Sequence, residues 1–463
     1  METVKRAPYV KMLDWVCTPY DVLRSVDERK HPMLLESGSD HAELGRYSIV
    51  CADPVLIFES SGRHVEIQRD STVEKNDCDP LESLRSLLKQ YQSEYRGSLP
   101  FYGGAIGYFS YDLKNQIENL PSCASRDIEI PDIWLGFYHW AFIFDHLENT
   151  LWLTVSEWAE DSVALAEEIS SYVGCRLQSA RDIQLVARKT APVIESNMTK
   201  AVYIQSIERV REYIRQGDIY QANFTQRFHC AMEGSALDLF GKIRTVNPAP
   251  FSAYLDIGEF QVVSASPERF IKVTDRIIET RPIKGTRPRG KNEAEDAVNR
   301  QELIDSEKDH AELLMIVDLE RNDLGRVAEP GTVKVLELFK LETYATVFHL
   351  VSTITARLKD GLDIVDCLRA TFPGGSITGA PKIRAMEIID ELEPTARNLY
   401  TGSVGYIGFN GDTDLNIVIR TILCKEGHAW FQTGGGIVWD SDPELEYEEC
   451  LHKAKGQVRA LSL

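Results

Sequence analysis

Short apolar runs and amphipathic stretches alternate along the first 190 residues of the chain. Apolar side chains recur at helical spacing in 81–95 and in 162–173, which predicts a helix in each. Apolar or aromatic-rich runs bounded by turn residues predict strands at 32–37, 48–52, 102–108, 130–144 and 151–155. No pairing of a nucleophile with a base and no metal-ligand spacing occurs in this region, so we expect a mainly structural lobe.

A polar segment at 180–196 precedes a second series of helices and strands. We therefore divide the chain into an N-terminal lobe, 1–190, and an expected catalytic domain, 196–463. Helices are predicted at 198–216, 305–318 and 443–453, and strands at 218–228, 261–265 and 346–351. Gly217 is expected to end the first of these helices. Helices and strands do not alternate as in βαβ units, which predicts an α+β fold.

The chain is strongly acidic, with 51 Lys and Arg against 71 Asp and Glu and a formal net charge of −20 over 463 residues. Such a surface repels phosphate backbones and anionic lipids, so we expect neither nucleic acid nor membrane as a partner. If the ligand is itself an anion, its site must supply local cations or a metal ion.

Cysteine usage and hydropathy indicate the cellular compartment. The 9 cysteines are scattered and form no Cys-x-x-Cys pair, which is typical of reduced thiols. No signal-peptide core and no apolar run of about 18 residues occurs. We therefore expect a cytoplasmic protein.

The segment 281–289 holds the first candidate for chemistry, the amine of Lys284 between Pro282 and Gly285. Proline fixes its own φ and glycine tolerates conformations closed to other residues, which predicts a sharp turn that can approach a ligand. A lone lysine in a loop is usually a solvated surface charge. The surrounding motifs favour a functional amine here.

Several carboxylates lie in contexts that suit either a surface or a site. Glu268 follows a predicted strand, as a surface side chain or as a buried general acid. Glu446 and Glu449 are three residues apart and share a helix face, with Lys453 one turn beyond Glu449. The ordinary interpretation is a solvated acidic face. The alternative, together with Glu312 on another helix, is a seat for Mg²⁺, which prefers a few carboxylates.

Two glycine-rich segments offer bare backbone amides. The segment 371–382 leads into a helix, but Ala380 and Pro381 precede Lys382, so it is not a nucleotide-binding P-loop. The run 434–436 suits a carboxylate, and Tyr406 and Arg420 lie on predicted strands before it. His349 is either a core histidine or part of the same site.

Together these stretches resemble the Mg²⁺-dependent chorismate-utilising enzymes, which include the anthranilate, aminodeoxychorismate, isochorismate and salicylate synthases. The resemblance is dense over about 200–460 and weaker in the first lobe, through 34–37. It implies a large antiparallel β-sandwich with helices packed outside, as in component I of anthranilate synthase.

Two positions distinguish the branches of this family. Gln221 stands where the water-adding enzymes carry a lysine, which leaves ammonia as the implied nucleophile. Lys284 stands where anthranilate synthases carry alanine, which favours the aminodeoxychorismate branch, in folate and para-aminobenzoate synthesis. The alternatives are an anthranilate synthase subunit and a non-catalytic protein that binds tryptophan or a partner.

The resemblance also implies roles for individual residues. Glu312, Glu446 and Glu449 would hold Mg²⁺, and Glu268 would protonate the departing C4 hydroxyl of chorismate. Lys284 would attack C2 to form a covalent adduct that ammonia resolves, which requires its pKa of about 10.4 to fall by roughly 2–3 units. The implied substrate-binding residues are Gly285, Thr286, His349, Tyr406, Arg420, Gly434, Gly435 and Gly436.

Partners and a second ligand follow from the same resemblance. No cysteine lies in a Gly-x-Cys-x-Gly context, so ammonia is expected to come from a separate glutamine amidotransferase subunit. Glu320 stands where a small residue is frequent, and we expect it not to touch the site. The residues that match the family's tryptophan pocket are Ser37, Leu44, Gly45, Arg46, Tyr47, Pro250, Phe251 and Ser252.

Overall fold

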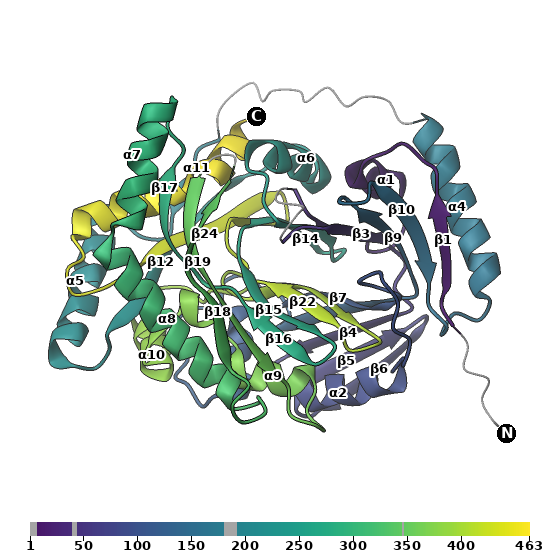
Figure 1. Ribbon diagram of the computed structural model, residues 1–463, viewed down its shortest axis with the longest axis horizontal. Coiled ribbons are helices and arrows are strands. Elements are labelled where there is room, and N and C mark those ends of the chain that lie inside the picture. Colours follow the sequence, from purple (N-terminus) through teal and green to yellow (C-terminus); the bar gives the residue numbers. More distant parts are fainter. Residues whose placement is uncertain (1–6, 39–43, 180–191, 345–346) are drawn as a thin grey trace.

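Two large antiparallel β-sheets form the centre of the molecule, and helices cover their outer faces (Figure 1). The computed structural model describes residues 7–38, 44–179, 192–344 and 347–463. Buried side chains of both sheets meet in a shared core that includes Met33, Ile49, Ile106 and Trp134. The predicted α+β class, with an antiparallel sandwich inside and helices outside, is confirmed.

Sheet A is one of the two layers. Its strands are β1 (Tyr9–Leu13), β2 (Met33–Glu36), β3 (Tyr47–Cys51), β9 (Trp140–Asp145), β10 (Thr150–Val155), β11 (Glu195–Ser196), β12 (Gln221–Ala231), β13 (Phe251–Asp256), β14 (Phe260–Ser266), β20 (Gly379–Ala380), β23 (Thr421–Lys425) and β24 (His428–Ile437). Their order is β1-β10-β9-β3-β2-β13-β14-β23-β24-β12-β11, with β20 paired to β12.

Sheet B is the other layer. Its strands are β4 (Leu56–Ser61), β5 (His64–Arg69), β6 (Thr72–Asp77), β7 (Gly104–Phe109), β8 (Ile133–Tyr138), β15 (Arg269–Thr274), β16 (Ile277–Thr280), β17 (Ile283–Pro288), β18 (Lys334–Thr343), β19 (Val347–Arg357), β21 (Ser403–Gly408) and β22 (Thr413–Asn416). Their order is β17-β19-β16-β15-β22-β21-β7-β8-β4-β5-β6, with β18 paired to β19.

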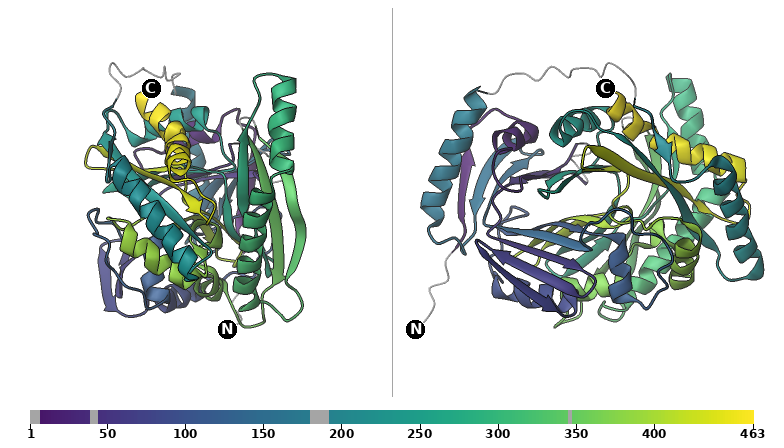
Figure 2. Two further views of the ribbon diagram at one scale, coloured as in Figure 1. Left: turned by 90° about the vertical axis from the view of Figure 1, so that its left-hand side faces the viewer. Right: turned by 180° about the vertical axis from the view of Figure 1, so that it is seen from behind.

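Each sheet has its own covering helices, which bury apolar stripes against it. Those with buried side chains in the core beneath sheet A are α1 (Pro19–Ser25), α4 (Ser162–Ser179), α5 (Lys200–Gln216), α6 (Ala236–Val246), α10 (Lys382–Leu392) and α11 (Pro443–Ser462). Those in the core beneath sheet B are α2 (Pro80–Gln90), α7 (Glu293–Ile304), α8 (Glu307–Gly325) and α9 (Ile364–Thr371). A short helix, α3 (Lys114–Ile117), follows β7. Helix α11 lies beside α5, where Tyr447 packs on Tyr203 (Figure 2).

Both sheets combine strands from the two segments of the chain. Strand β2 pairs with β13 in sheet A, and β7 pairs with β21 in sheet B. The N-terminal segment therefore completes the sheets that the C-terminal segment begins. The division into 1–190 and 196–463 stays a prediction about the chain, and part of its boundary lies outside the described residues.

Local signals placed most elements to within a few residues. Gly217 ends α5 in the left-handed conformation, at φ 84°, as expected. The predicted strand at 130–144 is instead two strands, β8 and β9, which His139 separates. None of the described helices combines the length and the apolarity needed to span a bilayer.

The predicted sharp turn at 281–289 is wrong. Residues Ile283–Pro288 form strand β17, which pairs with β19 at the edge of sheet B. The register shifts between Lys284 and Thr286, where Gly285 adopts φ 77°. A β-bulge therefore supplies the local irregularity that proline and glycine indicated.

Because each sheet needs both segments, residues 192–463 expressed alone should not fold. Without the N-terminal strands, β13 and β21 each lose a pairing partner and half of the inter-sheet core is missing. We expect one cooperative thermal transition for the full chain and none for the fragment, measured by circular dichroism. A soluble, monomeric fragment with a cooperative transition would contradict this interpretation.

Candidate active site

The Lys284 amine lies at the centre of a cluster of ionisable groups from both sheets and from two helices. Its Nζ donates to the carbonyl oxygen of Ser376 at 2.9 Å. A Cβ placed on Gly436 would lie 3.6 Å from the same nitrogen. The bulge requires glycine at position 285, because a Cβ there would lie 2.9 Å from Asp309 and from Leu303. Lys284 is therefore not a solvated surface charge, which was the ordinary interpretation of a lone lysine in a loop.

Burial and neighbouring charges act in opposite directions on Lys284. Desolvation lowers the pKa of this amine, and Lys453 lowers it further. The carboxylates of Glu312 and Glu268 raise the pKa, because they stabilise the ammonium form. The net direction is downward, toward the neutral amine that a nucleophile requires.

Glu268 is a buried carboxyl that interacts electrostatically with Lys284. It is 4% exposed, and the backbone amide of Ile283 donates to its Oε1 at 3.4 Å. Desolvation raises the pKa of Glu268, while Ser376 and the Lys284 ammonium oppose the shift. The net rise favours a protonated carboxyl, which is the form a general acid needs.

Three glutamates face the cluster from α8 and α11. Glu446 is 6% exposed and accepts from the Ser441 hydroxyl at 2.7 Å, whereas Glu449 is half exposed. Glu449 pairs with Lys453 at 2.7 Å, as the helical spacing predicted. The solvated-face interpretation therefore holds for Glu449 and fails for Glu446, which the packing of α11 on β24 buries.

Carboxylates from α8 and α11 lie around one positive charge, which is the ligand chemistry that a divalent cation needs. The Lys308 ammonium lies 3.9 Å from Glu312 and 3.9 Å from Glu446, so two carboxylates from two helices already converge on one positive charge. Buried carboxylate oxygens are the ligands that Mg²⁺ prefers. Within the described ranges, no three or more acidic, His or Cys side chains lie close enough together to hold a metal as they stand.

The glycine run of β24 explains how these groups come together. A Cβ on Gly434 would lie 2.0 Å from the carbonyl oxygen of Phe224, in the neighbouring strand. On Gly435 it would lie 3.0 Å from Glu446 Oε2, and on Gly436 2.1 Å from the side-chain nitrogen of Gln221. Each glycine therefore leaves space for a different neighbour.

His349 and Arg420 extend the cluster on the side of β17. His349 Nδ1 lies 2.9 Å from the Thr286 hydroxyl, and desolvation lowers the pKa of His349 to about 4, so its ring is neutral at physiological pH. Arg420 adopts φ 55°, donates to the carbonyl of Lys453, and interacts electrostatically with His349. A guanidinium beside a neutral imidazole suits an anionic ligand.

Comparison with known proteins agrees with this arrangement. A model of the chorismate binding enzyme family matches residues 31–459. The chain belongs to this family. It is 44% identical to aminodeoxychorismate synthase component 1 of Salmonella typhimurium over 91% of each chain. It is 35% identical to anthranilate synthase component 1 of Acetivibrio thermocellus, over 96% of this chain and 92% of the other.

The fold of this chorismate-binding enzyme also matches a solved relative. The crystal structure of anthranilate synthase component I from Streptococcus pneumoniae TIGR4 aligns with a TM-score of 0.80 at 32% identity, over 89% of this chain and 92% of the other. The expected component I-like sandwich is therefore confirmed.

Tyr406, which was predicted to bind the substrate, lies away from the cluster around Lys284. Tyr406 is 8% exposed, packs on Phe101 and lines a separate large cavity. Tyr400 instead interacts electrostatically with Arg420, and Ser376 contacts Lys284 through its carbonyl. Sequence analysis missed both residues, because they lie outside any periodic pattern and only chain folding brings them to the cluster.

The large cavity has a volume of about 460 Å³ and lies between the two sheets. Seven of the eight residues predicted for a tryptophan pocket line it, namely Ser37, Leu44, Arg46, Tyr47, Pro250, Phe251 and Ser252. The eighth, Gly45, is buried between two of them in the chain. Such a volume suits a ligand with an indole-sized ring.

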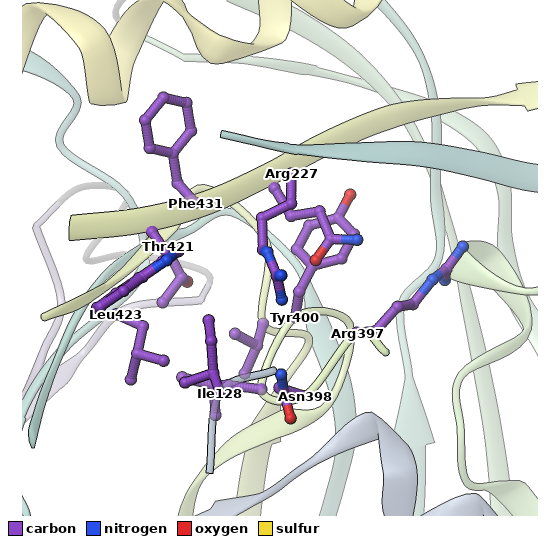
Figure 3. Close-up of a pocket in the computed structure, with 12 residues that line it drawn as sticks. Ile128, Arg227, Arg397, Asn398, Tyr400, Thr421, Leu423 and Phe431 are labelled. Atoms are coloured by element: carbon purple, nitrogen blue, oxygen red, sulfur yellow. The ribbon is translucent and has the colours of Figure 1, made fainter. Parts of the chain in front are cut away.

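A second, small cavity lies beside Tyr400 (Figure 3). Its volume is about 30 Å³, roughly that of one water molecule in the liquid, so it cannot hold a six-membered ring. In the part of the chain that the structure describes, Arg227 Nη1, Asn398 Nδ2 and Gln432 Oε1 line it or its edge without a hydrogen-bond partner. The cavity is a small void with a mainly apolar lining.

The close packing of β24 predicts that Gly434→Ala is strongly destabilising. Its Cβ would lie 2.0 Å from a backbone oxygen, which no side-chain rotation can relieve. We expect a loss of about 3 kcal/mol or more in the free energy of unfolding, or failure to fold. Gly325→Ala is the matched control, since a Cβ there meets nothing within 4 Å. Equal urea midpoints for the two variants would refute the packing argument.

Proposed function

We propose that this chain catalyses the Mg²⁺-dependent amination of chorismate by ammonia to 4-amino-4-deoxychorismate, in para-aminobenzoate and folate synthesis. The observation that carries the proposal is the half-buried Lys284 amine, whose Nζ is held by Ser376 beside Gly436 and whose pKa is lowered by burial. The relatives named aminodeoxychorismate synthase component 1 support the choice of product.

In the proposed first step, the lone pair of Lys284 Nζ attacks C2 of the ring. Both ring double bonds shift, from C1=C2 to C1=C6 and from C5=C6 to C4=C5, and the C4–oxygen bond breaks, while the proton of Glu268 passes to the departing oxygen to give water. The raised pKa of Glu268 supports its role as the acid, because the carboxyl keeps its proton closer to neutral pH. When bound by Glu312, Glu446 and Glu449, Mg²⁺ would supply positive charge for the ring carboxylate.

In the second step, ammonia forms a bond to C4, both ring double bonds shift back to C5=C6 and C1=C2, and the bond from C2 to Lys284 breaks. Lys284 leaves as the neutral amine, and the proton that the new C4 ammonium group loses returns to Glu268. Gln221 supports ammonia rather than activated water, because its neutral amide lies against Gly436, and its Oε1 has no hydrogen-bond partner among the described residues. That oxygen can accept from an incoming N–H.

The source of ammonia is proposed to be a separate glutamine amidotransferase subunit. The term component 1 in the names of the relatives supports a partner subunit. Buried reduced thiols such as Cys51, Cys367 and Cys424 support a reducing cytoplasmic location.

The proposed reaction is tested by incubating the purified chain with chorismate, Mg²⁺ and ammonium and identifying the product. We expect aminodeoxychorismate, and none when Mg²⁺ is omitted. Lys284→Ala should lower kcat on the order of 10³-fold or more, because it removes the nucleophile. Lys291→Ala, at an exposed lysine nearby, is the control and should keep the wild-type rate.

Other products decide between the remaining functions. Anthranilate would assign the chain to the anthranilate branch. No turnover, even with a glutaminase subunit present, would support a binding protein. A wild-type rate in Lys284→Ala would exclude the covalent step. Glu446→Gln should raise the Mg²⁺ requirement, with the exposed neighbour Glu448→Gln as its control.

The large cavity is proposed to bind tryptophan. We expect isothermal titration to detect L-tryptophan binding, and Ser37→Leu to abolish it, because Ser37 is 3% exposed and its hydroxyl bonds to Pro250 in the cavity wall. Val73→Leu, at an exposed strand position, should bind normally. Absence of binding at millimolar tryptophan would reject this part of the proposal.

A further inference from the structure

Glu320 is a buried carboxyl that the proposed mechanism does not use. It lies on α8, is 7% exposed, and its hydrogen-bond partner is the Thr280 hydroxyl at 2.9 Å. The nearest positive charge, Lys382, forms an ion pair with Asp323. Burial of an unpaired carboxylate is costly, so this carboxyl is favoured in its neutral, protonated form.

The hydrogen bonds of Thr280 support the same protonation state. Its Oγ lies 2.8 Å from the carbonyl oxygen of Phe270 and 2.9 Å from Glu320 Oε2. A hydroxyl has one proton and a carbonyl can only accept. If Thr280 donates to Phe270, the second contact is satisfied only when Glu320 holds a proton and donates it to Thr280.

The packing of Glu320 connects it to the segment that holds Lys284. Phe270, Thr280, Glu320, Gly374 and Gly375 line a cavity of about 10 Å³, which has room for a single water molecule at most. A Cβ on Gly375 would lie 3.4 Å from Glu320 Cγ and 2.9 Å from Leu319. The next residue, Ser376, accepts from Lys284 Nζ through its carbonyl.

We infer that Glu320 is a positioning residue: a protonated carboxyl that fixes strand β16 and the 374–376 segment behind Lys284 and Glu268. When this proton leaves, a buried negative charge replaces a hydrogen-bond donor in a nearly closed space. The 374–376 segment then loses its support from α8. The stability part of this inference stands alone, and its catalytic part rests on the proposed function.

The electrostatic surroundings give the direction of the pH dependence. The pKa of Glu320 is raised to about 8, chiefly by desolvation and also by Glu268 and Asp323, whereas Lys382 and any hydrogen bond that Thr280 donates to the ionised carboxylate oppose the rise. The folded state therefore binds a proton that the unfolded state has released above the ordinary carboxyl pKa of about 4.3. The contribution of Glu320 to stability is greatest below about 4.3, falls as pH rises toward 8, and changes little above pH 8.

The test compares Glu320→Gln with Asp318→Asn, an exposed carboxyl on the same helix. Urea unfolding is measured at intervals from pH 5 to pH 9. One bound proton changes the unfolding equilibrium constant by up to about tenfold per pH unit. We expect the wild type and Asp318→Asn to show this extra dependence between pH 5 and pH 7.5, and Glu320→Gln to lack it, because its amide is neutral and still donates.

Two further measurements distinguish positioning from simple packing. The infrared band of a protonated carboxyl should be present in the wild type at pH 7, titrate away above pH 8, and be weaker in Glu320→Gln. The wild-type kcat should fall between pH 7 and pH 9 by a factor that is smaller in Glu320→Gln. Because Glu268 is also expected to hold a proton, the band is assigned to Glu320 in Glu268→Gln, where it should persist at pH 7 and titrate away above pH 8 even if Glu320→Gln does not fold.

The inference is overturned if Glu320→Gln keeps the wild-type pH dependence of unfolding. It is equally overturned if the infrared band is absent at pH 7, or if the kcat profiles coincide. A chain that does not convert chorismate at all would reject the proposed function, while the unfolding and infrared results would still decide whether Glu320 holds its proton.

Discussion

The absence of side chains along a short length of β24 is the constraint on which the site depends. Gly434 lies against the backbone of β12, Gly435 against Glu446, and Gly436 between Gln221 and Lys284. Strands β12 and β17 and helix α11 therefore reach the same three residues. The reactive groups are held by strand pairing and helix packing, which position side chains more accurately than loops do.

Burial has a coordinated effect on the two groups proposed to react. It lowers the pKa of Lys284 and raises that of Glu268, so both shifts favour the neutral forms. The carboxylates of Glu312 and Glu268 oppose the shift of Lys284, because they stabilise its ammonium form. A neutral amine beside a protonated acid is the combination that the proposed first step requires. Burial and the neighbouring charges set these two pKa values, and the chain's net charge of −20 does not.

The sandwich architecture places two different cavities and the cluster within one framework. Strand β13 lines the large cavity through Phe251 and Ser252, and it pairs with β14, which leads to Glu268. Sheet A, which lines the cavity proposed for tryptophan, therefore leads through β14 to Glu268, the proposed general acid. On the outer face, α8 carries both Glu312 and the buried Glu320, so one helix contributes to the cluster and to its support.

The sequence by itself determined most elements, the α+β class and most residues of the cluster. Hydrophobic periodicity, glycine positions and the spacing of charged residues depend only on neighbours in the chain. Tertiary structure alone decided that 283–288 is a bulged strand, that Tyr400 rather than Tyr406 lies near Arg420, and that Glu320 is buried against Thr280. It also decided that Glu446 is buried and Glu449 is not. Three-residue spacing places both on one helix face, but burial depends on which strand packs opposite each side chain.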